Sequence, residues 1–112
     1  MGLRFRSELQ KVATVSFTVG TTVIVPTTAL VGIQRAGIYR VALNSAAGST
    51  FQFQDTGTNN ISAVYTMPAN GFAIFDLANN FDPWWQATAA LLGLQIVTSA
   101  TVTGDIYWAA GA

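Results

Sequence analysis

Residues 50–55 read TFQFQD, and this short stretch decides the fold class. Phe51 and Phe53 alternate with glutamines, a period of two that places the rings on one face of a strand and the amides on the other. Turn-forming residues flank the stretch on both sides, SAAGS at 45–49 and TGTNN at 56–60. The sequence therefore predicts a half-buried β-strand between two turns.

The same rhythm recurs along most of the chain. β-Branched and aromatic residues dominate these runs, as is typical of strands, and Pro26, Pro68 and the Asn70-Gly71 dipeptide mark strand ends and turns. No stretch carries an apolar stripe of helical period longer than two turns. The other expected strands are ATVSFTV at 13–19, TVIV at 22–25, GIYRVALN at 37–44, ISAVYTM at 61–67, GFAIFDL at 71–77, LLGLQIVTS at 91–99 and TVTGDIYWA at 101–109.

About eight short strands within 112 residues predict one all-β domain. The expected architecture is a single antiparallel two-sheet sandwich of the jelly-roll or Greek-key type, with an N-terminal arm. We place the arm at residues 1–11 and the sandwich at residues 12–112.

The arm, MGLRFRSELQK, holds four of the ten charges of the chain. As a helix it would form a short amphipathic turn. As an extended segment it would present Leu3 and Phe5 on one side and Arg4 and Arg6 on the other. Either form suits a segment that reaches a neighbouring molecule.

The chain carries few charges for its size. Charged residues make up 9% of the sequence, against about 25% in an ordinary soluble domain, and the formal net charge is zero. Because charges are depleted at interface cores, such a surface suits a protein buried against other subunits, although a neutral secreted sandwich domain is the alternative. The neutral balance argues against a nucleic-acid partner, which needs a basic surface.

The distribution of charge also has a pattern. All five basic residues and one of the five acidic residues lie within the first 40 positions. Such complementarity would suit a head-to-tail contact between copies. The uncharged stretch between Lys11 and Arg35 mixes threonines and Pro26 with apolar residues, so we expect neither a membrane span nor a signal peptide.

The residue types that most enzymes need are missing. The chain has no histidine and no cysteine, so it lacks the commonest general base, a thiolate nucleophile and the commonest zinc ligands. No nucleophile elbow, P-loop or dinucleotide fingerprint occurs. Calcium takes oxygen ligands, but the loop from Asp76 to Asp82 and the turn from Asp55 to Asn60 match no EF-hand and consist of ordinary turn formers. We predict a protein that is not an enzyme and holds no metal or cofactor.

The aromatic residues are the better candidates for function. If the loop after Pro83 is extended, one of Trp84 and Trp85 faces the core and the other faces outward. An outward tryptophan would anchor a protein contact, or stack on a sugar beside Asn79, Asn80 and Gln86. In the alternative, both rings close the end of the core and an indole N–H bonds to a loop carbonyl.

Six features in order form a recognisable pattern over residues 13–110: Gly20-Thr21-Thr22 after a threonine-rich strand, Gly37-Ile38-Tyr39-Arg40-Val41, the pair Phe51 and Phe53, Asn70-Gly71, Trp84-Trp85, and Gly104-Asp105-Ile106-Tyr107-Trp108. This order resembles a group of small β-sandwich proteins of tailed-phage virions. The basic arm has no counterpart in that pattern.

The resemblance implies a virion structural protein, and the chain is closest in size to the decoration or cement type. Such proteins sit on the outer capsid surface, commonly as trimers, and clamp neighbouring major capsid proteins. We therefore expect a homotrimer made in the host cytoplasm and bound to the major capsid protein, with no nucleic-acid or membrane partner. A carbohydrate-binding sandwich of a tail tip or fibre, and a head-completion or tail component, are the alternatives. The predicted partner-binding residues are Leu3, Arg4, Phe5, Arg6, Trp84 and Trp85.

Overall fold

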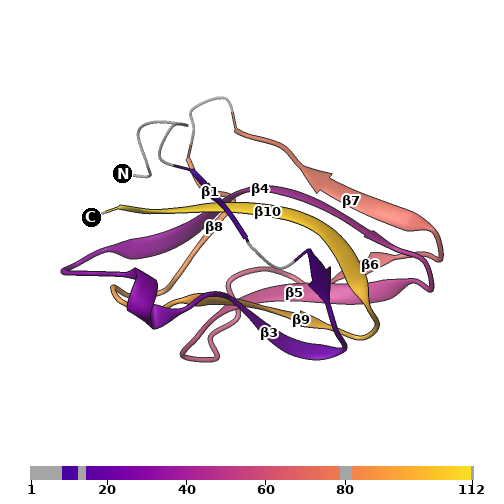
Figure 1. Ribbon diagram of the computed structural model, residues 1–112, viewed down its shortest axis with the longest axis horizontal. Coiled ribbons are helices and arrows are strands. Elements are labelled where there is room, and N and C mark those ends of the chain that lie inside the picture. Colours follow the sequence, from indigo (N-terminus) through magenta and orange to yellow (C-terminus); the bar gives the residue numbers. More distant parts are fainter. Residues whose placement is uncertain (1–8, 13–14, 79–81, 112) are drawn as a thin grey trace.

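The computed structural model describes residues 9–12, 15–78 and 82–111. Over these ranges the chain forms ten β-strands and one 3-10 turn, η2 (Thr27–Ala29), and none of its helical segments has the length and hydropathy of a membrane span. Figure 1 shows two layers of strands facing each other. The strands are β1 (Gln10–Lys11), β2 (Ser16–Phe17), β3 (Gly20–Val25), β4 (Arg35–Ser45), β5 (Ser49–Asp55), β6 (Tyr65–Met67), β7 (Gly71–Phe75), β8 (Trp85–Gln86), β9 (Leu94–Thr98) and β10 (Val102–Gly111).

The strand order is that of a jelly roll. One sheet runs β1-β10-β4-β7, with β2 also paired to β10 and β8 to β4, and the other runs β3-β9-β5-β6. Since β1 and β2 share one edge of β10, and β7 and β8 share one edge of β4, each pair behaves as one interrupted strand. Counted in this way, the two layers contain strands 1-8-3-6 and 2-7-4-5, all antiparallel, which confirms the predicted two-sheet sandwich.

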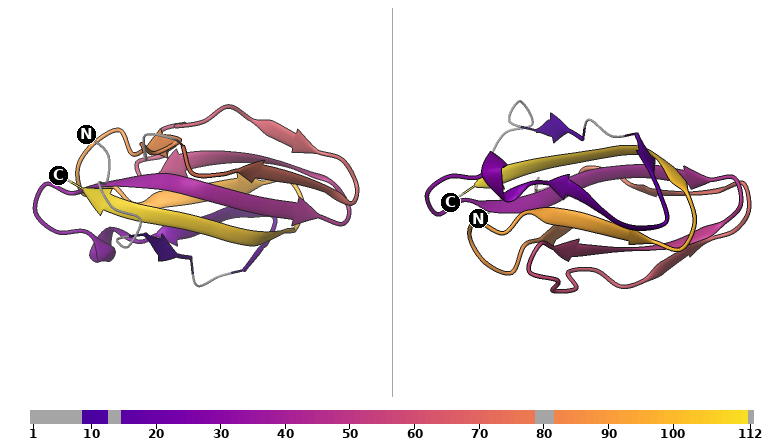
Figure 2. Two further views of the ribbon diagram at one scale, coloured as in Figure 1. Left: turned by 90° about the horizontal axis from the view of Figure 1, so that it is seen from above. Right: turned by 60° about the horizontal axis from the view of Figure 1, so that its bottom comes forward.

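The long strands β4 and β10 form the centre of the larger sheet. They pair from Thr103 with Asn44 to Gly111 with Arg35, and Figure 2 shows them side by side along the molecule. The core lies between this sheet and β5 and β9 of the other sheet. Its largest fully buried apolar side chains are Phe17, Val25, Ile38, Val41, Leu43, Phe51, Phe53, Leu94, Ile96, Val102 and Ile106.

The strand that decides the fold class has the predicted alternation. Phe51 and Phe53 on β5 are fully buried, and the alternating residues Thr50, Gln52 and Gln54 are half-exposed. Asp55 continues the inward face and is also fully buried.

Several predicted strand boundaries differ from the structure, and two of the differences have a clear cause. Gln10 and Lys11, which the sequence analysis assigned to the arm, pair with Trp108 and Tyr107 of β10, so the sheet begins inside the predicted arm. Of the predicted strand 61–67 only β6 pairs as a strand, because the Ser62 hydroxyl, rather than a backbone carbonyl, accepts the hydrogen bond from the Phe53 N–H at 2.9 Å.

Candidate interaction surface

Trp84 and Trp85 lie where the chain returns to the edge of β4. The backbone N–H of Trp84 donates to the Ile38 carbonyl at 2.8 Å, and Trp85 then pairs with Ile38 as part of β8. The two ring centroids lie 6.3 Å apart and both rings contact Phe75, but the two side chains differ in burial. Trp85 is half-buried and packs against the core, whereas Trp84 is 44% exposed.

Trp85 belongs to an aromatic cluster that packs against the core. Its ring centroid lies 4.9 Å from that of Phe53, 4.9 Å from that of Phe75 and 6.0 Å from that of Tyr65. These are tilted and edge-to-face arrangements, which aromatic rings prefer. Trp85 therefore acts in folding, and its place in the predicted partner-binding set has no support from its position.

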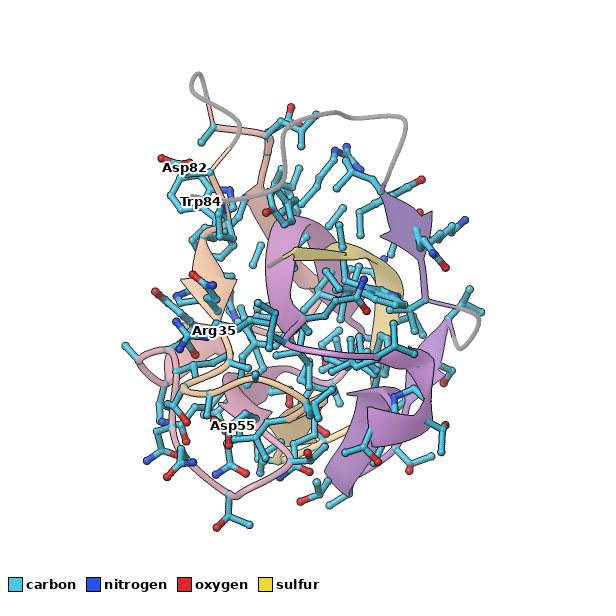
Figure 3. The ribbon with its side chains drawn as sticks, turned by 90° about the vertical axis from the view of Figure 1, so that its left-hand side faces the viewer. Arg35, Asp55, Asp82 and Trp84 are labelled. Carbon is cyan, nitrogen blue, oxygen red and sulfur yellow. The ribbon has the colours of Figure 1, made fainter. Side chains whose placement is uncertain are left out.

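Trp84 combines the two alternatives predicted from the sequence, an indole N–H bonded to a loop carbonyl and a ring that faces outward. Its indole Nε1–H donates to the Asp76 carbonyl at 2.5 Å, and its ring meets Phe75 edge-on at 5.6 Å. The indole N–H is thus satisfied by a loop carbonyl, while nearly half of the side chain faces outward. Figure 3 shows Trp84 beside Asp82 at the margin of this end of the sandwich. Leu3, Arg4, Phe5 and Arg6 lie outside the described residues.

Large apolar side chains are exposed at many points of the described surface. Scattered single residues of this kind are ordinary, but contiguous groups mark contact sites. Val31, Ile33 and Leu91 lie on two loops joined by the hydrogen bond from the Leu91 N–H to the Gln34 carbonyl. The ten with the greatest exposure, from 44% to 73%, are Val15, Val19, Val23, Val31, Ile33, Val64, Phe72, Ile74, Trp84 and Leu91.

Phe72 and Ile74 form a patch that the sequence analysis did not single out. They share the outer face of β7 and are 70% and 57% exposed. Opposite them on β4 stand Asn44 and Ala42, which are too small to cover them. The sequence GFAIF at 71–75 is apolar on both faces of the strand, whereas the core of the sandwich covers only one of them. This pattern could have predicted the patch.

The ion pairs of the described chain join its basic first part to its acidic later part. Lys11 Nζ lies 3.1 Å from Asp105, and Arg40 Nε lies 3.0 Å from Asp76 while its guanidinium stacks over Tyr107 at 5.7 Å. The hydrogen bond and charge of Asp105 raise the pKa of Lys11 above its usual value. Four of the charges predicted to orient a head-to-tail contact, two of each sign, are therefore paired within one chain.

Tyr107 and Trp108 lie on the two faces of β10. Trp108 is buried in the core, and Tyr107 is partly exposed beside Arg40. Trp108 therefore belongs to the core.

Asp55 is the one fully buried carboxylate of the described residues. It accepts hydrogen bonds from the backbone N–H groups of Gly57, Asn59 and Thr88 at 3.0 to 3.1 Å, and from the side chains of Asn59 and Thr88. Arg35 extends the network by donating to the Thr88 carbonyl at 3.3 Å. Figure 3 shows Arg35 and Asp55 on the same end of the molecule. Both oxygens of Asp55 serve the chain itself, so its role is to hold two loops together.

Metal-ligating side chains are few among the described residues. These residues contain no group of three or more His, Cys, Asp or Glu residues that could hold a metal ion. An open hollow of about 570 Å³ at the opposite end of the sandwich is lined by small residues such as Ala46, Ala100 and Thr101 and by no ionisable side chain. Asn79 and Asn80, named for calcium or sugar binding, lie outside the described ranges.

Comparison of the chain with protein-family models, with curated proteins and with solved structures found no match. The fold stands on the strand pairing described above. The likeness to virion sandwich proteins rests on the sequence pattern alone.

Proposed function

We propose that this chain is a virion structural protein, a decoration or cement subunit that binds the outer surface of an assembled phage shell. Its partner is the major capsid protein, and its working form, assembled on the shell, is a homotrimer. The observation that carries the proposal is the surface of the described residues, which has ten well-exposed large apolar side chains and ion-paired charges. Such a surface is costly in water and is favoured where other subunits cover it.

The mechanism follows from mass action. A protein that binds the assembled lattice and not its free subunits lowers the free energy of the lattice alone, and so stabilises the shell. Three weak contacts in a trimer add through effective concentration, so no single contact needs high affinity. Trp84 contributes an apolar anchor, and Leu3 and Phe5 of the arm contribute others. Arg4 and Arg6 are suited to carboxylates of the partner.

Co-sedimentation with shells assembled from the major capsid protein encoded alongside this chain tests the proposal. The wild-type chain should pellet with shells, saturate, and raise the temperature at which they dissociate. A truncation that lacks residues 1–8 keeps β1 and should fold but bind less. Trp84→Ala should also bind less, while the matched control Val23→Ala, at an exposed valine of another strand, should not. A wild-type chain that stays in the supernatant at every concentration refutes the proposal.

A carbohydrate-binding role is the second candidate, because the Trp84 indole N–H is already satisfied and leaves part of its ring to stack on a sugar. Glycan binding that disappears in Trp84→Ala and survives in Val23→Ala would favour it. A ringed location at the head vertex or in the tail would instead favour the head-completion or tail role.

A further inference from the structure

The outer edge of β7 has no partner within the described chain. β7 pairs with β4 from Gly71 with Ser45 to Phe75 with Val41, and it ends the order of its sheet. Apart from this ladder, the backbone groups of residues 72–75 make no hydrogen bond to any described residue. Figure 1 shows β7 at the margin of the molecule. The edge therefore offers free N–H and C=O groups to another strand.

This edge also lacks the usual protection against pairing. Native edge strands carry charges, prolines or bulges that discourage a second chain. The β1 edge has Lys11, β6 is followed by Pro68, and β3 has a register shift between Val23 and Val25. The sequence of β7, GFAIF, has neither charge nor proline, and its ladder is regular. Of the four outer edges it is the one best suited to accept a strand.

We propose that β7 pairs with β7 of a second copy, antiparallel about a two-fold axis at Ala73, and joins the larger sheets of two molecules. This register places Phe72 of each copy opposite Ile74 of the other, so that the patch covers itself. It also places Asp76 opposite Asn70, and not opposite the second Asp76. A register shifted by one residue in each copy would oppose Phe72 to itself and leave Ile74 uncovered.

The size of the contact defines its strength. Phe72 and Ile74 are 70% and 57% exposed, which amounts to about 200 Å² of apolar surface per copy. Stable interfaces bury about 800 Å² per partner. The net charge of zero adds no long-range repulsion between copies. The dimer is therefore weak and reversible. It does not depend on the proposed shell binding, because it is tested with the purified chain alone.

Sedimentation equilibrium from about 10 µM to 1 mM tests the dimer. The wild-type chain should show a concentration-dependent rise in mass that depends on β7. The double variant Phe72→Lys/Ile74→Lys should stay monomeric with an unchanged circular dichroism spectrum, since both side chains face solvent. The control Val23→Lys, at a half-exposed position on the β3 edge, should associate as the wild type does.

Two further variants test the pairing itself. Mixing the double-lysine variant with Phe72→Glu/Ile74→Glu should restore a dimer that neither forms alone, because each lysine then faces a glutamate. The chain has no cysteine, so Ala73→Cys should cross-link to itself on oxidation, while Val23→Cys should not.

Three results would overturn the proposal. The first is a wild-type chain that remains monomeric at 1 mM, which would leave the edge to a different protein. The second is an oligomer whose mass is unaffected by the two lysines. The third is equal cross-linking of both cysteine variants.

Discussion

Removing the buried carboxylate of Asp55 should destabilise the sandwich more than any surface change. Asp55 is fully buried at the end of β5, and the turn that follows β5 and the segment before β9 both donate to it. The variant Asp55→Ala leaves the N–H groups of Gly57, Asn59 and Thr88 without their acceptor. Asp55→Asn keeps one acceptor oxygen and turns an amide group toward the donors of Thr88.

The expected cost follows from the number of bonds lost. A buried donor left unsatisfied costs about 1–3 kcal/mol, less where water can enter. With three backbone donors affected, we expect Asp55→Ala to lower the free energy of unfolding by about 3–5 kcal/mol, and Asp55→Asn by about 2–3 kcal/mol. Small domains have only about 5–15 kcal/mol in total, so the loss is large.

The effect should also depend on pH in a defined direction. Burial alone would raise the pKa of Asp55, but the hydrogen bonds from Thr88 and Asn59 outweigh it and lower that pKa from its ordinary 3.8. A lowered pKa means that the ionised carboxylate stabilises the fold. This contribution is complete at pH values about one unit or more above 3.8. It is lost as the pH falls through the folded-state pKa of Asp55.

Urea unfolding measured at several pH values checks both parts. The difference between wild type and Asp55→Asn should be constant from about pH 7 to pH 5 and shrink below about pH 4. The control Asp105→Asn removes an exposed ion pair with Lys11, and should cause a much smaller loss that fades with added salt. A difference under about 0.5 kcal/mol for Asp55→Asn at pH 7 would show that the network does not hold the loops.

Two pairs of substitutions test the packing. Trp85→Ala removes the ring that meets Phe53 and Phe75 at 4.9 Å and should cost about 3–5 kcal/mol in urea unfolding, clearly more than Trp84→Ala; equal losses would contradict the assignment of Trp85 to the core. Gly104→Ala should lower the free energy of unfolding by about 3 kcal/mol or more, because the new Cβ would lie 2.0 Å from the Ala42 carbonyl oxygen at a φ of +144°. Gly20→Ala, with open space and a φ of +101°, should lower it by only about 1–2 kcal/mol through backbone strain.

The sequence predicts the sandwich well because period-two alternation is a local property. Phe51 and Phe53 are buried as their spacing requires, and Pro68 and Asn70 lie between β6 and β7. The local pattern cannot show where a side chain replaces a backbone group in the ladder. Ser62 does so opposite Phe53, and the predicted strand 61–67 is shortened as a result.

The candidate contacts could be predicted only in part for a similar reason. Alternation predicts that one of Trp84 and Trp85 faces outward. The choice between them depends on the pairing of Ile38 with β8, and this pairing joins residues far apart in the chain. The same holds for the ion pair between Arg40 and Asp76, which fold topology brings together. The exposure of Phe72 depends on the small size of Asn44 across the ladder.

The two proposals reinforce each other through concentration. A β7 contact of about 200 Å² per copy is too small to hold two free molecules together in dilute solution. A lattice that holds neighbouring copies side by side raises their effective concentration into the millimolar range, where weak contacts form. An unprotected edge is a hazard for a free protein, because it also invites unrelated strands. On a shell the same edge would be met first by its own copies, so it would link them only after each had bound.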